Sequence, residues 1–193
     1  MIDPYNITNY NMTDAGLEEV LLFWVLVAGK KASTTAERLE ALLTKITYNN
    51  ISPFEAIRQY AYDHVGDEYS GLATLLWSTG IGCYTHKART MKELALRRLN
   101  LRTCTSDDLE KIYGIGMKTA RCFIIHSREN AKCAGLDTHV LKFLRDKGHD
   151  VPKSTPGSKK KYKELEQLFL GYAEASDKTI AEFDLDIWRY YTK

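Results

Sequence analysis

The sequence contains little cysteine, and its four cysteines are not spaced as metal ligands or as a redox pair. Cys83, Cys104, Cys122 and Cys133 include no Cys-x-x-Cys spacing, which is the usual signature of zinc and iron–sulfur sites. We therefore expect free thiols in a reducing compartment, no metal site and no iron–sulfur cluster.

Long apolar runs and a strong charge bias are also missing. The longest apolar stretch covers residues 20–28, which is too short to span a bilayer, and residues 1–4 lack the basic start of a signal peptide. We expect no membrane association and a cytoplasmic location, near a nucleoid or in a host cytoplasm if the protein is viral. The net charge of +2 is by itself a weak indication of a nucleic-acid partner.

Sustained two-residue alternation is absent, and apolar residues recur instead at helical spacing. We predict an all-α protein with roughly ten helices and short connections. Thr13, Ser52 and Ser106 are expected N-caps, and residues 148–161 are expected to form a basic loop. The predicted helices cover residues 16–28, 34–46, 53–61, 69–78, 84–99, 107–113, 117–126, 136–147, 162–175 and 180–191.

The most informative segment is Gly114-Ile115-Gly116, a tight turn between two predicted helices. Glycines permit backbone angles or close approaches that a Cβ would obstruct. Amide groups at the start of the second helix would attract a phosphate oxygen. Taken alone, the turn is more typical of an ordinary helix–turn–helix corner in which glycine follows the first helix.

A lysine and an aspartate give this turn a chemical meaning. Lys118 lies at the start of the second helix, and Asp137 precedes another predicted helix in the segment Gly135-Leu136-Asp137-Thr138-His139. Asp137 is expected to act as an N-cap, as a catalytic carboxylate, or as both. A surface lysine and a capping aspartate are each common, but their combination at this separation around a Gly-x-Gly turn is not.

With these residues the sequence resembles the helix-hairpin-helix DNA glycosylases, which include endonuclease III and the 8-oxoguanine glycosylases. Residues 112–120 are similar to the family's hairpin, residues 136–139 to its Val/Leu-Asp-Thr-His segment, and residues 82–89 to its Gly-x-Tyr-x-x-Lys-Ala segment. The resemblance covers residues 70–147.

The resemblance implies two helical lobes with the DNA cleft between them. Residues 1–46 and 135–193 would form the terminal lobe, and residues 47–134 the central lobe that carries the hairpin. The expected partner is double-stranded DNA with a damaged base, bound by a monomer. A monovalent cation at the hairpin is also implied by the resemblance, and no other cofactor is expected.

Departures from the family pattern narrow the expected activity. The four-cysteine cluster of endonuclease III is absent, and Leu26-Val27-Ala28-Gly29 replaces its glutamine-containing segment. The short chain and its aromatic, acidic end, residues 183–188, look like the compact archaeal-type 8-oxoguanine glycosylases. We therefore expect an oxidised base, with 8-oxoguanine as the candidate.

The resemblance also assigns roles to individual side chains. Lys118 would attack C1′ of the sugar and form a Schiff base, and Asp137 would accept a proton or stabilise positive charge. We expect the helix terminus and partial burial to lower the pKa of Lys118. The expected DNA-binding residues are Gly114, Ile115, Gly116, Thr119, Arg121, His139 and Lys87, and the expected base-pocket residues are Trp188, Phe143 and Lys193.

Two other functions remain compatible with the same residues. The scaffold could belong to a phage-type enzyme that modifies the flipped base and keeps it. It could also be a helix-hairpin-helix module that binds DNA without chemistry. The leading interpretation is a bifunctional DNA glycosylase and AP lyase.

Overall fold

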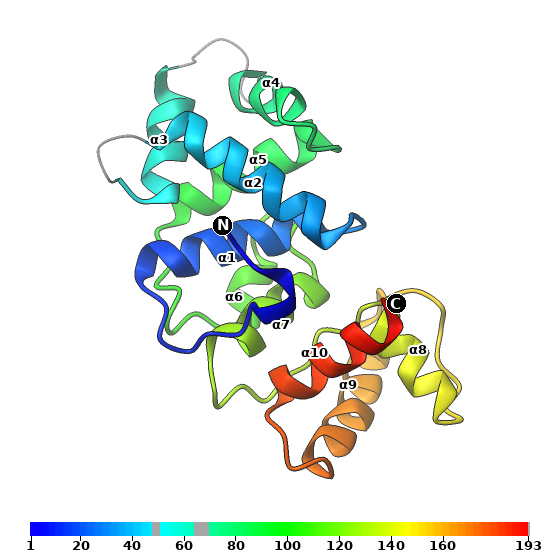
Figure 1. Cartoon of the computed structure of the whole chain (residues 1–193). Coiled ribbons are helices and arrows are strands. Elements are labelled where there is room, and N and C mark those ends of the chain that lie inside the picture. The colour runs from blue at the N-terminus through cyan, green and yellow to red at the C-terminus, as the bar shows by residue number, and fades with distance from the viewer. Residues whose placement is uncertain (48–50, 64–69, 193) are drawn as a thin grey trace. The chain divides into compact units, whose positions relative to one another are not determined.

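The computed structural model describes residues 1–47, 51–63 and 70–192, and over these residues it contains helices and no strand (Figure 1). The prediction of an all-α protein is confirmed. The helices are η1 (Pro4–Asn6), α1 (Asp14–Val27), α2 (Ala32–Ile46), α3 (Pro53–Asp63), α4 (Ser70–Ser78), α5 (Tyr84–Arg97), α6 (Ser106–Glu110), α7 (Met117–Ser127), α8 (Thr138–Asp146), α9 (Lys159–Glu174) and α10 (Ile180–Tyr191). The predicted start of α4 at residue 69 and the base-pocket candidate Lys193 lie outside the described residues.

Side-chain caps explain where several helices begin. Thr13 Oγ1 accepts a hydrogen bond from Gly16 N at 3.1 Å, and Ser52 Oγ accepts one from Glu55 N at 3.3 Å. These bonds satisfy amides that have no intrahelical acceptor. The predicted caps at Thr13 and Ser52 are therefore confirmed.

Two helix starts differ from the prediction. The cap of α6 is Thr105, not Ser106, because Thr105 and Asp108 form a reciprocal capping box. Helix α9 begins at Lys159, so the predicted basic loop ends earlier than expected. The side chain of Ser158 accepts a hydrogen bond from Lys161 N at 3.5 Å, and lysine itself favours helix.

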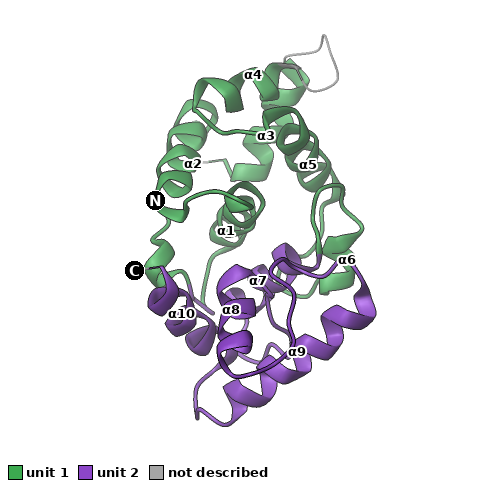
Figure 2. Ribbon diagram, turned by 90° about the vertical axis from the view of Figure 1, so that its right-hand side faces the viewer, with its two compact units in different colours: residues 1–7, 11–116 green, residues 8–10, 117–193 purple. Residues whose placement is uncertain are grey.

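The chain divides into two compact units, coloured separately in Figure 2. Unit 1 comprises residues 1–7 and 11–116. Its core helix α1 packs against α2, α3 and α5 and buries most of its side chains. In unit 1 the N-terminal helices α1 and α2 therefore share a core with α3 and α5.

Unit 2 comprises residues 8–10 and 117–193. Helices α8, α9 and α10 pack on one another around a core that includes Leu141, Tyr162 and Phe169. The short segment 8–10 belongs here because Asn9 N donates to His126 O at 3.1 Å.

These bounds differ from the lobes implied by the resemblance. Residues 1–46 lie almost entirely with the central helices, and the boundary between the units falls at Gly116, inside the hairpin. The physical reason is the packing of α1 on α3 and α5, which the local periodicity of each helix does not reveal.

Candidate active site

The turn before α7 requires glycine at one of its two glycine positions. Gly114 has φ +79°, and an added Cβ would overlap Oγ1 of Thr90. The turn is closed by a hydrogen bond from Ile115 N to Ile112 O at 3.1 Å. Gly114 is therefore demanded by both backbone angle and space.

Gly116 is different, because an added Cβ there would meet no atom within 4 Å and its φ is not positive. Packing within the chain therefore does not require this glycine. Gly116 directly precedes α7 in the chain, and the first amides of a helix lack intrahelical acceptors. Such a surface suits the close approach of a phosphate.

Three polar side chains line one face of α7. Lys118, Cys122 and His126 are spaced at i, i+4 and i+8, which places them on the same side of a helix. Cys122 and His126 are buried, and the Lys118 amine hydrogen-bonds the Cys122 sulfur. Lys118 is thus held against a buried face of its own helix.

Asp137 is the N-cap of α8, as predicted. Its Oδ1 accepts hydrogen bonds from His139 N and Val140 N, both at 2.8 Å. Because both bonds use Oδ1, the second carboxylate oxygen is not engaged by the cap. The predicted N-cap role of Asp137 is confirmed, and it does not prevent a chemical one.

A close approach joins the Asp137 loop to α7. An added Cβ at Gly135 would overlap the Sγ of Cys122. The loop and the helix can therefore approach so closely only because residue 135 has no side chain. This contact brings the turn that precedes Asp137 next to the α7 face that carries Lys118.

The electrostatics of this cluster differ from the expectation for Lys118. Burial acts to lower its pKa, but Cys122 and the carboxylates of Asp137 and Asp184 outweigh this effect, and the pKa is raised. Burial raises the pKa of Cys122 to about 12, so its thiol is neutral near pH 7. The neighbouring carboxylates are therefore the groups that stabilise the protonated amine. The prediction of a lowered lysine pKa was wrong for the free protein.

The carboxyl of Asp137 has a raised pKa, mainly because of burial and the neighbouring Asp184. Its hydrogen bond from Val140 N and the charge of Lys118 act in the opposite direction. A carboxylate of this kind accepts a proton more readily than an ordinary aspartate. Asp137 is therefore the candidate proton acceptor of this cluster.

Sequence reasoning missed Asp184, which lies on α10 and is 8% exposed. Its Oδ2 lies 3.3 Å from Nε2 of His126, and Nδ1 of His126 lies 2.8 Å from Oγ1 of Thr8. A carboxylate within the apolar pattern of α10 was the available signal, because a buried aspartate needs a partner.

Comparisons with known proteins found similarity to 8-oxoguanine DNA glycosylases, over part of the sequence and over the fold. No family model matches the chain. The chain is 38% identical over 80 residues to the 8-oxoguanine DNA glycosylase/AP lyase of Metallosphaera sedula, which covers 42% of this chain and 38% of that relative. The matched segment is thus less than half of the relative's length.

Two solved structures resemble almost the whole chain. The 8-oxoguanine DNA glycosylase of Thermotoga maritima has a TM-score of 0.69 at 23% identity, covering 95% of this chain and 83% of its own. The Methanocaldococcus jannaschii 8-oxoguanine glycosylase/lyase, crystallised with DNA containing 8-oxoguanine, has a TM-score of 0.67 at 20% identity, covering 94% and 83%. The chain has the fold of the 8-oxoguanine DNA glycosylases.

Within this glycosylase fold, two of the expected DNA contacts have other roles. Lys87 is buried and its Nζ donates to Leu26 O, the end of α1, at 2.6 Å. Arg121 is also buried and forms an ion pair with Glu166 at 2.8 Å. Both cations are used inside the protein, so the expectation that they contact phosphates is corrected.

The remaining predicted residues vary in exposure. Thr119 and Ile115 are buried, whereas Gly114 and Gly116 are exposed and His139 and Trp188 are half-buried. Phe143 makes edge contacts with the rings of Phe169, Tyr172 and Phe183. Phe143 is therefore partly buried and packs against the core of unit 2, and its assignment as a wall of the base pocket stays a prediction.

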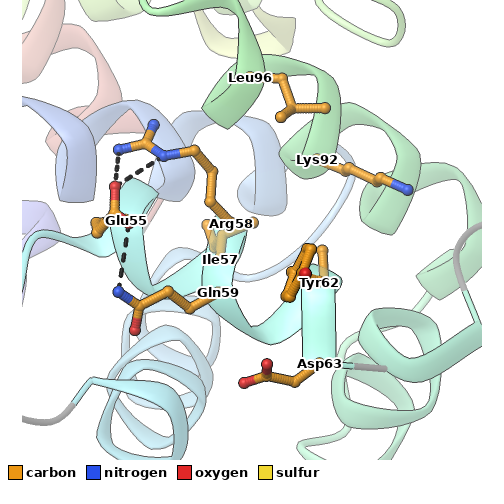
Figure 3. Close-up of a pocket in the computed structure, with 9 residues that line it drawn as sticks. Glu55, Ile57, Arg58, Gln59, Tyr62, Asp63, Lys92 and Leu96 are labelled. Carbon is orange, nitrogen blue, oxygen red and sulfur yellow. Dashed lines mark hydrogen bonds and ion pairs between the residues drawn. The ribbon is translucent and has the colours of Figure 1, made fainter. Parts of the chain in front are cut away.

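A separate pocket of about 650 Å³ lies in unit 1 and is lined from α3 and α5 (Figure 3). Its wall includes an ion pair in which Arg58 lowers the pKa of Glu55. None of the predicted site residues lines this pocket. Within the described residues, no group of three or more His, Cys, Asp or Glu side chains is arranged to bind a metal, and no helix has the length and hydropathy of a membrane span.

Proposed function

We propose that this chain is a base-excision DNA glycosylase with AP lyase activity, and that its substrate is double-stranded DNA containing 8-oxoguanine. The observation that carries the proposal is the close approach of Gly135 to Cys122, which brings the loop of Asp137 next to the α7 face that carries Lys118 within unit 2. The relatives named 8-oxoguanine glycosylases support the choice of base.

The proposed reaction begins with a flipped nucleotide, because a base inside a duplex cannot be reached by a side chain. Amides at the start of α7 would hold a backbone phosphate next to the lesion. Lys118 transfers its proton to Asp137 and the neutral amine attacks C1′, so an N–C1′ bond forms while the bond to the base breaks. The base leaves with the electron pair of that bond and is then protonated.

The covalent adduct rearranges to a Schiff base, which acidifies the hydrogens on C2′. Loss of one C2′ proton and departure of the 3′ phosphate complete a β-elimination and nick the strand. The amine supplies the nucleophile in this scheme, so no metal is required, and activity should persist in a chelator such as EDTA.

The test uses duplexes that carry single lesions, with borohydride to trap the Schiff base. Wild type should nick the 8-oxoguanine strand and give a trapped adduct, and Lys118→Gln should abolish trapping. Lys142→Gln is the matched control, because Lys142 is an exposed lysine of α8 in the same unit. Undiminished trapping in Lys118→Gln would refute the assignment.

The same experiment separates the alternatives. A mass change on an uncut strand would indicate base modification, and binding without any product would indicate a non-catalytic module. A panel of duplexes with oxidised pyrimidines alongside 8-oxoguanine would establish which base is excised.

A further inference from the structure

Helix α9 carries two buried polar side chains, Tyr162 and Glu166, and Glu166 pairs with the buried Arg121 of α7. Tyr162 is 0% exposed, Glu166 6% and Arg121 6%. Tyr162 and Glu166 are one turn apart on α9 and so face the same way. Their hydrogen bonds lead to the short segment of chain that precedes Asp137.

The bonds hold both sides of that segment. The Tyr162 hydroxyl donates to Ala134 O and accepts from Leu136 N, both at 2.9 Å. Glu166 Oε1 accepts from Ala134 N at 2.9 Å. These hydrogen bonds therefore tie residues 134 and 136, which flank Gly135, to α9.

The same carboxylate connects to the helix that carries the amine. Arg121 Nε donates to Glu166 Oε1 at 2.8 Å, and its guanidinium lies 4.8 Å from the centre of the Tyr162 ring. Arg121 follows Lys118 by one turn of α7. One buried network thus joins the helix of the proposed nucleophile to the loop of the proposed carboxylate.

We propose that Arg121, Tyr162 and Glu166 are positioning residues, which hold the 134–136 segment against α7 and thereby set Asp137 against Lys118. This inference rests on the proposed function. The three residues act through the backbone and do not touch the substrate.

Stability alone is a poor explanation for this network. A buried ion pair pays a large desolvation penalty, and apolar replacements of similar volume are often equally stable. A network that bonds specific backbone groups instead restricts geometry. Burial also raises the pKa of the Tyr162 hydroxyl well above its usual range, so it remains protonated and able to donate throughout the working pH range.

The test compares two identical substitutions on α9. Tyr162→Phe removes the hydroxyl that bonds Ala134 and Leu136 but keeps the ring. Tyr172→Phe is the matched control, because its hydroxyl bonds His149 at 2.9 Å, away from the Asp137 loop. Glu166→Gln tests the charge, since it can still accept from Ala134 N.

Two measurements are made on each full-length variant. The first is the single-turnover rate of borohydride trapping on abasic-site DNA, together with the Kd for the same duplex. The second is hydrogen–deuterium exchange of the peptide covering residues 131–140, which requires no activity. Tyr162→Phe should slow trapping by about tenfold or more, leave Kd within about twofold and increase exchange at Leu136. Tyr172→Phe should change none of these.

Each other outcome is decisive. Faster exchange with an unchanged trapping rate would show that the network is structural only and overturn the inference. Unchanged exchange in Tyr162→Phe would show that the network does not restrain the segment. If wild type traps no DNA, the proposed function fails, while the exchange data still decide whether the restraint exists.

Discussion

The contact between Gly135 and Cys122 allows a direct test of how the Asp137 loop is placed. In Gly135→Ala the new Cβ would lie well inside 3.0 Å of the Cys122 sulfur, whereas the next atoms, N and Cβ of Cys122, lie at 3.4 and 3.5 Å. Gly135 does not have a positive φ, so alanine is compatible with its backbone angles. The sulfur is therefore the source of the expected penalty.

The size of the effect follows from the displacement needed. Restoring an ordinary contact requires a shift of roughly 1 Å, and overpacking of this kind costs about 1–3 kcal/mol. For a chain of this length each kcal/mol lowers Tm by about 2–4 °C. Asp137 follows two residues later, and if it acts as proposed, a misplacement of about 1 Å can reduce the rate by about 10²-fold.

A double-mutant cycle isolates this contact. Cys122→Ala removes the sulfur, and the methyl group of Ala at 135 would then occupy part of the vacated volume. Thermal unfolding and single-turnover nicking are measured for wild type, both single variants and the double variant. We expect Gly135→Ala to be destabilising in the wild-type background and nearly neutral in the Cys122→Ala background.

Because Cys122 also hydrogen-bonds Lys118, the nicking rate of the double variant is compared with that of Cys122→Ala. Equal losses of stability from Gly135→Ala in both backgrounds would refute the reasoning, since the penalty would then not come from the sulfur.

The other predictions concern the hairpin and the proton that the proposed mechanism passes from Lys118 to Asp137. In Gly114→Ala the new methyl group would overlap Thr90 and the alanine would have a positive φ. This variant should lower stability by about 1–3 kcal/mol in thermal unfolding, whereas Gly116→Ala should leave stability unchanged. Equal effects of the two substitutions would contradict the distinction between the two glycines. The wild-type trapping rate should change little with pH between the raised pKa of the Asp137 carboxyl and the raised pKa of Lys118, and should fall at lower pH as Asp137 becomes protonated and can no longer accept a proton. In Asp137→Asn the amine must lose its proton to solvent, so the rate should rise about tenfold per pH unit over the same range; a flat profile in this variant would argue against proton transfer to Asp137.

The parts of the site that could be predicted are those in which neighbouring residues specify the structure. The cap of α8 depends on Asp137 and the two amides that follow it, and the tight turn depends on Gly114 and its neighbours. Both features can be read from a few consecutive residues. Helix α10 was predicted over the range that the structure shows because its apolar periodicity runs along the whole helix.

The parts that could not be predicted depend on partners far away in the chain. Arg121 looks like a phosphate contact until Glu166, 45 residues later, is found next to it. The raised pKa of Lys118 depends on Asp184 as well as Asp137, and no local pattern places α10 beside α7. A charged residue has the same appearance in a sequence whether it faces solvent or a buried partner.

The boundary between the two units leads to a final expectation about the hairpin. Lys118, Asp137 and the network that supports them all belong to unit 2, so their separation is set by α7, α8 and α9 within that unit. Gly114 and Thr90 belong to unit 1. If the proposed function is correct, Gly114→Ala should weaken DNA binding, after correction for the folded fraction, while the pH profile of trapping at saturating DNA stays that of wild type. The profile reports the proton shared by Lys118 and Asp137, and a change in it would mean that the unit-1 half of the hairpin also helps to position the reacting pair.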